Sequence, residues 1–592
     1  MHFLTAFFLF LALRAIYRTP RLSNAAAGQK RWVPFLGALL WSVSPVHTQA
    51  VTYIVQRMTV LAAMFTIIGI LFYLRGRLSS SRAGSLSSFV LCCAALLCAV
   101  ASKENAATLP LTLVLLELAF FPDTLGGLRR ALFRRSPVPA IVVTLIAAGL
   151  FAAANLTILP SLSGRETAIT PLESLLTIPA ALIYYASLLL FPVTSRLSIE
   201  HDFPVAAGLF DPWTTLPAAL CVLLIVVAAL ARIERRPLVA FAILFFILNH
   251  LIEGSTLTIE LIAEHRNYLP SLFLFAPLAA LALSALKRLD TGVPVRALAG
   301  LSFLLITASM AAGTYSRNLV WETEKSLWED AMVKAPAKAR PPQILATAIY
   351  MPEGDYDRAL ELLEKSLSLK AVIPEYSRSQ AHMNIGKVYL MQREYQRAVE
   401  ATRKALTLFP PDGDGYYQMT LALTGAGEVR QARALAEELV RDGGRTTPDP
   451  RLVRLLAFML IREGRPAEAL EKLEPLLPTS SDGHALLLAG RALSRTGRFS
   501  EAEEMLRRAA EIYIYPFDVF LARAENRLRA GDADGAVSLA AELSGTVGKD
   551  TIIDAMEELF QDALSIPPSR ELHNLFQAEL PVTFPPADRS GY

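Results

Sequence analysis

The sequence predicts an all-α protein in two parts, a polytopic bundle of transmembrane helices followed by a solenoid of short helical repeats. Of the 592 residues, 53% are hydrophobic, and the mean hydropathy is +0.39, which is too apolar for one soluble domain. The apolar residues form long runs up to about residue 315, and the rest of the chain is charged with helical periodicity. In this second part, small residues recur at the period of helical repeat proteins.

Eleven apolar runs in the first part have lengths near the ~20 residues that a helix needs to cross a bilayer. They lie at 3–17, 33–49, 58–74, 87–102, 106–121, 137–158, 173–191, 213–231, 237–251, 268–286 and 297–315. We therefore predict ten or eleven segments in a membrane domain over residues 1–315. Several runs are short or contain proline or glycine, which a bundle tolerates because neighbouring helices satisfy the freed backbone groups.

Lysine and arginine accumulate in the short loops that face the cytoplasm. Five basic clusters fit this description: Arg18/Arg21/Lys30/Arg31, Arg75/Arg77/Arg82, Arg129/Arg130/Arg134/Arg135, Arg232/Arg235/Arg236 and Lys287/Arg288/Arg296. If all five clusters lie on the cytoplasmic side, the chain must cross the membrane an even number of times between Arg135 and Arg232. Three apolar runs, however, lie between these two residues. One of the runs 137–158 and 173–191 is therefore not a full span, and Pro179 favours 173–191 as the partly interfacial one.

Four polar segments between the runs are not simply basic, and this orientation places all of them on the outer face. They are Val46–Arg57, Ser102–Asn105, Ser198–Phe203 and Glu253–Ser271, hereafter the four polar loops. Ionisable groups beside membrane helices are costly, so they indicate a functional site. The alternative is a set of charged connectors whose Arg and Tyr side chains anchor helix ends at the interface. The fourth loop alone does not decide between the two.

The second part has a regular repeat. Small alanines recur at Ala359, Ala398, Ala432, Ala469, Ala502 and Ala536, and glycines precede five of them by five residues, at Gly354, Gly427, Gly464, Gly497 and Gly531. Arg393 stands where the sixth glycine is expected. Residues 381–410 match the tetratricopeptide repeat (TPR) pattern, so we predict a TPR solenoid of about six repeats over 341–565. Such solenoids form a concave face that holds a peptide or protein; a spacer without a partner is the alternative.

Two segments flank the predicted solenoid. Residues 316–340 are predicted to be an amphipathic linker, in which Trp321 and Trp328 lie on one side of a helix. These tryptophans would seat the solenoid on the membrane domain or lie in the membrane interface. Residues 566–592 are predicted to form an irregular tail.

Several classes of function lack support in the sequence. A net charge of +3 is small for 592 residues and indicates no nucleic-acid partner. The four cysteines, Cys92, Cys93, Cys98 and Cys221, lie in apolar runs without zinc or disulfide spacing. No P-loop, dinucleotide glycine motif, nucleophile elbow or HExxH motif occurs. We therefore predict neither a cofactor nor a metal, and a metal site built from His47, His201 and His265 is the weaker alternative to histidines that form hydrogen bonds.

The polar loops suit a substrate that is part lipid and part polar. The candidate ligands of a lipid-linked phosphate are Arg57, Lys103 and Arg266, since Arg offers a bidentate fork and Lys a point charge. The candidate general bases toward an acceptor hydroxyl are Glu104, Asp202 and Glu264. Further polar residues of the same loops are His47, Gln49, His201, His265, Asn267 and Tyr268.

Four motifs in order, followed by repeats, carry a family resemblance. SPVHTQAVTYIVQRMTVLAAMF, SKENAATLPLTLVLLE, LSIEHDFP and IELIAEHRNYLPS precede RNLVWETEKSLWEDAMVKAP and the repeats. From about Leu36 to its end, the chain resembles the transmembrane and tetratricopeptide-repeat containing (TMTC-like) proteins. Animal members are O-mannosyltransferases of the GT-C class that use dolichyl-phosphate mannose. The short loops are similar to those of a bacterial relative.

The resemblance implies a GT-C-like membrane domain and a polyprenyl-phosphate sugar donor. It also implies transfer to protein Ser or Thr hydroxyls, repeats that present the acceptor, and a location in the inner membrane with the TPR domain on the periplasmic side. GT-C enzymes carry a catalytic acidic residue in the first outer loop, after a first helix, whereas this chain begins within an apolar run at His2. The predicted orientation of the loops also indicates a missing N-terminal piece. We therefore expect the chain as it stands to lack its catalytic base. A non-enzymatic membrane-anchored scaffold is the alternative function, and a transporter fits poorly because no inverted repeat is evident.

Overall fold

The computed structural model describes residues 1–122, 138–154, 169–252, 262–288, 293–369, 374–409, 413–442, 449–477, 482–512 and 516–580. The secondary-structure elements of these residues are helices. The chain divides into two compact units, the first over Met1–Leu345 and the second over Ala346–Tyr592. The predicted linker, residues 316–340, therefore lies entirely within the first unit.

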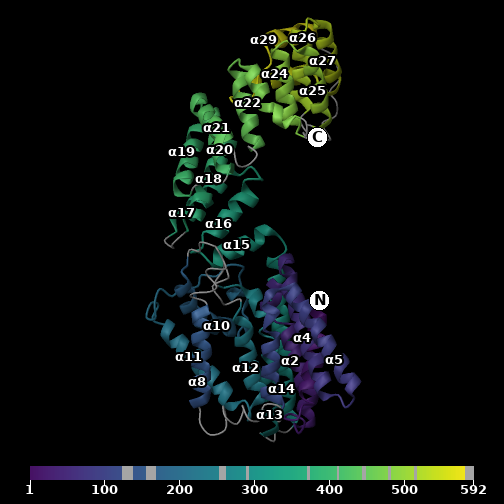
Figure 1. Cartoon of the computed structure of the whole chain (residues 1–592), viewed down its shortest axis with the longest axis vertical. Helices are drawn as coiled ribbons and strands as arrows, with labels where there is room; N and C mark the ends of the chain where they lie inside the picture. Colours follow the sequence, from purple (N-terminus) through teal and green to yellow (C-terminus); the bar gives the residue numbers. More distant parts are fainter. Residues whose placement is uncertain are drawn as a thin grey trace. The chain divides into compact units, whose positions relative to one another are not determined.

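The first unit contains a helix for each of the eleven apolar runs. Its helices are α1 (His2–Ile16), α2 (Ala27–Ser42), α3 (Thr48–Thr52), α4 (Arg57–Leu78), α5 (Arg82–Ser102), α6 (Leu109–Phe120), α8 (Val138–Ala153), α10 (Pro171–Leu190), α11 (Thr215–Arg232), α12 (Pro237–His250), α13 (Phe275–Arg288), α14 (Val293–Val320), α15 (Glu324–Lys334) and α16 (Arg340–Ile344). The 3₁₀ turns η1 (Pro45–His47), η2 (Ile54–Gln56), η3 (Glu104–Thr108), η5 (Thr194–Arg196) and η6 (Glu264–Asn267) lie between them. The main core joins α1, α2, α4, α6, α12 and α13 (Figure 1).

Five helices in the described part of the chain are long and apolar enough to cross a membrane, judged by length and composition. They cover Ile54–Leu78, Arg82–Ser102, Pro171–Leu190, Thr215–Arg232 and Val295–Val320. The apolar helices α1, α12 and α13 are shorter, since proline or a polar loop ends them. The number of segments that cross the membrane remains a prediction, because length and composition identify these five helices only among the described residues.

Helix α10 contains the run that we predicted to be partly interfacial. It has the length and composition of a span, and two of its side chains bond to backbone in or near the polar loops. The Thr177 hydroxyl accepts a hydrogen bond from the Ala206 N–H at 2.9 Å, and the Tyr185 hydroxyl accepts one from the Ala263 N–H at 2.9 Å. These contacts agree with an interfacial position, which remains a prediction.

The second unit consists of paired helices. They are α17 (Tyr356–Ser368), α18 (Glu375–Met391), α19 (Tyr395–Leu408), α20 (Gly413–Gly425), α21 (Val429–Asp442), α22 (Pro450–Arg462), α23 (Pro466–Leu473), α24 (Gly483–Arg495), α25 (Phe499–Ile512), α26 (Pro516–Arg529), α27 (Ala533–Val547), α28 (Lys549–Gln561) and α29 (Arg570–Glu579), preceded by a π-helical turn at Leu345–Tyr350 and with a 3₁₀ turn at Glu474–Leu476. All six predicted contact alanines have no exposed surface. The prediction of an irregular tail over 566–592 was wrong in part, because residues 570–579 form α29, which buries Leu572 and Phe576; residues 581–592 lie outside the described part.

The turns between paired helices confirm the predicted register. Each of the five predicted glycines has a positive φ between 77° and 84°, and Arg393 takes the same conformation with φ 61°. Residues other than Gly, Asn and Asp adopt this positive-φ backbone conformation at a cost in free energy. Conformation therefore explains the glycine pattern, and Arg393 tolerates a strained position.

Replacing Gly497 by Ala is expected to lower the free energy of unfolding of the second unit by about 1 kcal/mol, because a Cβ strains the backbone at positive φ. An added Cβ at Gly497 meets nothing within 4 Å, so strain alone is tested. Thermal unfolding followed by circular dichroism measures the effect. The control Gly497→Asn should cost less, and equal melting temperatures for G497A and the parent would contradict this explanation.

Candidate functional site

The first and third polar loops contact the described part of the fourth in the first unit. The turns η1 and η6 contact each other, α3 contacts η6, and η3 contacts α4, α6 and α12. Residues 253–261 of the fourth loop lie outside the described part, so the fourth loop is represented by residues 262–271. These contacts join the first, third and fourth loops, and the placement of all four loops on the outer face remains a prediction.

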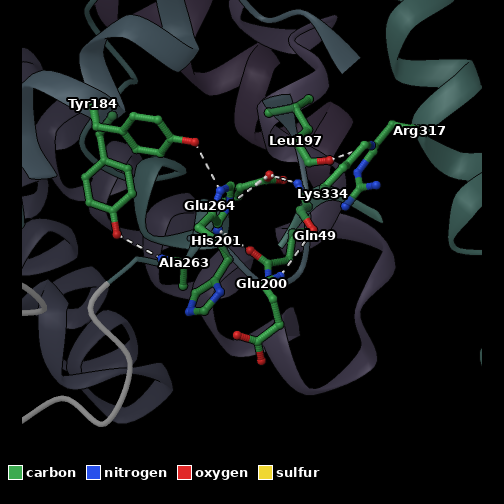
Figure 2. Close-up of polar contacts among 12 residues, drawn as sticks. Gln49, Tyr184, Leu197, Glu200, His201, Ala263, Glu264, Arg317 and Lys334 are labelled. Atoms are coloured by element: carbon green, nitrogen blue, oxygen red, sulfur yellow. Dashed lines mark hydrogen bonds and ion pairs between the residues drawn. The ribbon is translucent and has the colours of Figure 1, made fainter. Parts of the chain in front are cut away.

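Glu264 joins the third and fourth loops. Its side chain is fully buried, and its Oε1 accepts a hydrogen bond from the Ser198 backbone N–H at 2.6 Å. His201 Nε2 lies 3.3 Å from the same oxygen, and His201 Nδ1 lies 3.1 Å from the Tyr184 hydroxyl (Figure 2). Glu264 Oε2 has no hydrogen-bond partner among the described residues. Glu264 thus holds the third loop and retains one free carboxylate oxygen.

Gln49 joins the first and fourth loops. Its Oε1 accepts a hydrogen bond from the His265 backbone N–H at 2.8 Å (Figure 2). Burial, together with the positive charges of Lys103 and Arg266, lowers the pKa of His265 to about 2. His265 is therefore a neutral imidazole between two cations at physiological pH.

Lys103 and Arg266 are both buried, unlike most cationic side chains. Lys103 Nζ donates to the Thr59 hydroxyl at 3.1 Å, and that hydroxyl donates to Gln56 Oε1 at 2.8 Å. Arg57, the third predicted phosphate ligand, is exposed at the start of α4. The structure therefore brings two of the three predicted cations into the buried cluster.

The three candidate carboxylates lie in different surroundings. Glu104 is exposed. Asp202 is also exposed, and its Oδ2 accepts a hydrogen bond from the Ala337 N–H at 3.0 Å. Of the three, Glu264 alone is buried with the polar loops.

A second group of buried rings lies beside η1. Trp41, His47 and Tyr268 have ring centroids 4.6 to 5.1 Å apart. The Ser271 hydroxyl accepts a hydrogen bond from Trp41 Nε1 at 3.0 Å and lies 3.1 Å from His47 Nε2. These contacts make His47 and Tyr268 packing residues that fix the first loop against the fourth.

The described residues contain no group of three His, Cys, Asp or Glu side chains that could hold a metal ion. The alternative metal site from His47, His201 and His265 is therefore not formed. Asn267 is fully buried, and neither atom of its side-chain amide has a partner among the described residues. This cluster thus has hydrogen-bonding capacity that the described protein atoms do not use.

Residues of the predicted linker (316–340) also hold the third loop in place. The sequence did not predict this arrangement. Lys334 Nζ donates to the backbone carbonyl of Leu197, directly before this loop, at 2.8 Å (Figure 2). It also donates to the carbonyl of Thr194 at 3.0 Å. Arg340 forms an ion pair with Glu200 at 3.0 Å. Successive residues of this loop therefore alternate between the buried cluster and the linker.

Asp330 lies between two cations of the same region. It pairs with Arg317 and with Lys334, each at 2.6 Å. The i,i+4 spacing of Asp330 and Lys334 was a sequence signal for a helical ion pair. Trp321 packs against Tyr53 at 5.6 Å and Trp328 lies beneath Arg340. Both contacts lie within the first unit.

The histidines of the cluster predict that acid destabilises the first unit. Burial lowers the pKa values of His265 and His47, so the folded state binds fewer protons than the unfolded state below pH 6.5. His265 alone should reduce the free energy of unfolding by about 2 kcal/mol between pH 6.5 and 5. Melting temperatures of the parent and of His265→Gln at both pH values measure this. The decrease in melting temperature from pH 6.5 to pH 5 should be smaller for H265Q than for the parent. Equal decreases would contradict the assignment of this effect to His265.

In the second unit, alternate helices line a groove. Helices α18 and α20 supply most of the wall of a cavity of about 620 Å³, in which Tyr376, Asn384, Lys387 and Tyr417 are found. A neighbouring cavity of about 440 Å³ continues over α20, α22 and α24. This groove is where the predicted peptide or protein partner would bind.

Models of the tetratricopeptide repeat family match residues 345–410, 450–475 and 484–514. The second unit therefore contains tetratricopeptide repeats. No curated protein matches the chain.

Solved structures with some likeness include YrrB, described as a TPR protein with an unusual peptide-binding site (22% identity, 33% of this chain, 97% of that chain, TM-score 0.26). The type IV pilus biogenesis factor PilW has 19% identity over 35% of this chain and 93% of its own, with a TM-score of 0.31. Yeast Tom70 has 14% identity over 93% of both chains, with a TM-score of 0.29.

Proposed function

We propose that the chain is an integral membrane glycosyltransferase-like protein. Its first unit would bind a polyprenyl-phosphate sugar and transfer the sugar to protein Ser or Thr hydroxyls, and its repeats would present the acceptor. The observation that carries this proposal is the buried cluster of Lys103, Arg266 and Glu264 at the ends of apolar helices. A polyprenyl-phosphate sugar has an anionic, polar headgroup and an apolar tail. The headgroup suits the buried charged cluster, and the tail suits the apolar helices.

The outer surface of the first unit supports a membrane location. Large apolar side chains are exposed on α5, α11 and α14, among them Leu97, Leu224 and Leu304. Such side chains are stable in lipid, where a helix satisfies its own backbone. The basic loops would face the cytoplasm, and the polar loops and the TPR unit would then lie on the periplasmic side of the inner membrane.

The phosphate would bind to Lys103 and Arg266. Arg266 offers a planar fork for two phosphate oxygens, and Lys103 offers a point charge. The neutral His265 between them adds no further positive charge, and its ring is free to donate or accept a hydrogen bond. Asn267 supplies further hydrogen bonds for the sugar.

Glu264 is the best candidate for the general base. Its Oε1 holds the Ser198 N–H, and its Oε2 has no partner among the described residues. A carboxylate oxygen in that position can accept the proton of an acceptor hydroxyl. Glu104 and Asp202 are exposed, so they would serve less well.

The second candidate is a membrane-anchored scaffold without transferase activity, whose repeats bind envelope proteins. The contacts of Glu264 with Ser198 and His201 favour this candidate, because they explain the burial of Glu264 as a structural role without any catalytic one. In that case the polar cluster would only join the loops.

A transfer assay separates the two candidates. The full chain in detergent is incubated with polyprenyl-phosphate mannose and a Ser/Thr-rich peptide, and the peptide mass is measured. If Glu264 serves in place of the base that the GT-C resemblance puts in the first outer loop, the parent transfers the sugar and Glu264→Gln, which keeps an oxygen for the Ser198 N–H, does not. Arg235→Gln, in an exposed basic loop, is the matched control and should retain transfer. A folded parent that captures a protein partner but transfers no sugar would favour the scaffold.

A further inference from the structure

The segment between α28 and α29, Asp562–Pro568, crosses the groove of the TPR unit. We call this segment the strap. Residues 563–565 form a turn and residues 566–568 have no helical structure, and Leu564, Ser565 and Ile566 line the same cavity as residues of α20, α22 and α24. The strap therefore occupies space that a groove ligand would use.

The groove holds the strap largely through its main chain. The guanidinium of Arg462, on α22, donates to the Ala563 carbonyl, and Arg491 Nη1, on α24, donates to the Ile566 carbonyl at 2.5 Å. At the start of the strap, Asp562 lies 3.9 Å from Arg393, in the turn after α18. The strap thus runs from the turn after α18 across α22 and α24.

The far end of the strap is fastened at α26. Glu525 Oε2 accepts hydrogen bonds from the N–H and the hydroxyl of Ser569, at 2.9 and 2.8 Å. Ile566 is buried, and Pro567 and Pro568 lie with it beside Arg491 and Leu521. Two prolines favour the extended backbone that this position requires.

We propose that the groove is a binding site for a non-helical, proline-containing peptide, and that the strap is its resident ligand. The arginines of the groove bind backbone carbonyls, which every peptide has, so binding depends little on the side chains of the ligand. An external peptide with the same backbone conformation would therefore fit the same site. This inference rests on that part of the proposed function which places a peptide in the groove, and it does not require sugar transfer.

The occupied and open parts of the groove define what a partner can reach. The cavity over α18 and α20 contains no strap residue, and it presents Tyr376, Asn384 and Lys387. A partner would bind there first as an extended segment, and it would displace the strap to extend over α22 and α24. Displacement would lengthen the site without any rearrangement of the helices.

The experiment uses the strap itself as the probe. A fluorescent peptide of residues 559–569 is titrated against the full chain in detergent, and its anisotropy is measured. The parent is compared with a variant in which residues 562–568 are replaced by a glycine-serine linker of equal length. We expect the linker variant to bind the peptide about tenfold more tightly than the parent, in which the strap already bonds to Arg462 and Arg491. Arg491→Ala in the linker variant should weaken binding about tenfold.

Arg507→Ala, on the outer helix α25, is the matched control and should leave binding unchanged. If the linker variant does not fold, as judged by circular dichroism, Ile566→Asp within the intact chain replaces it. Equal binding by the parent and the variant, or no binding by a folded variant, would overturn the proposal. Because the probe carries no sugar and needs no donor, a failed transfer assay would leave this result unaffected.

Discussion

Replacing Asp330 by Ala is expected to lower the free energy of unfolding of the first unit by about 3–5 kcal/mol, because it leaves Arg317 buried without its counterion. The side chain of Arg317 is 1% exposed and that of Asp330 is 17% exposed. Arg317 Nε and Nη2 have no hydrogen-bond partner among the described residues, so no other carboxylate in that part replaces the lost one. The same substitution also releases Lys334, which fastens the third polar loop.

Thermal unfolding of the full chain in detergent measures this effect. Asp330→Asn keeps a hydrogen-bond acceptor and should fall between the parent and D330A. The neighbouring Glu329 is exposed, so Glu329→Ala is the control and should melt with the parent. If D330A and E329A melt at the same temperature, Arg317 does not depend on Asp330.

Replacing Glu264 by Ala has the second largest expected effect, a loss of about 3 kcal/mol. The substitution removes the acceptor of the buried Ser198 N–H and the partner of His201, and an unsatisfied buried donor is costly. Because the third loop loses its inner attachment, we also expect faster proteolysis at residues 198–203. Limited proteolysis with mass spectrometry locates the cleavage.

Glu264→Gln separates the two roles of this residue. Its amide oxygen can still accept from Ser198, so E264Q should retain most of the stability that E264A loses. A carboxamide cannot act as a general base, so sugar transfer should nevertheless be lost. An E264A variant as stable as the parent would show that Glu264 does not hold the third loop.

The repeat register was predictable because it is local. A turn at positive φ selects glycine, and a close helix contact selects alanine, so both leave a mark at fixed intervals. The burial of all six alanines and the conformation of Arg393 follow from that pattern. The strap left no such mark, because a non-helical segment in a groove has the composition of an irregular tail.

The polar cluster was predictable only in part. The basic loops fix which polar loops share a face, and this grouping brought Gln49, Lys103, His201 and Glu264 together. Burial of Lys103 and Arg266, in contrast to Arg57, depends on how the helices pack, and nothing in the residue type distinguishes the three. The contacts of Lys334 were missed because backbone carbonyls, which every residue has, are its partners.

The account depends most directly on whether the buried cations bind a lipid-linked phosphate. Equilibrium binding of radiolabelled polyprenyl-phosphate mannose to the full chain in detergent measures this. We predict saturable binding that free polyprenyl phosphate competes, about tenfold weaker binding by Lys103→Gln, and unchanged binding by Arg235→Gln. A folded parent that does not bind the donor, or a folded K103Q that binds it as the parent does, would contradict the account.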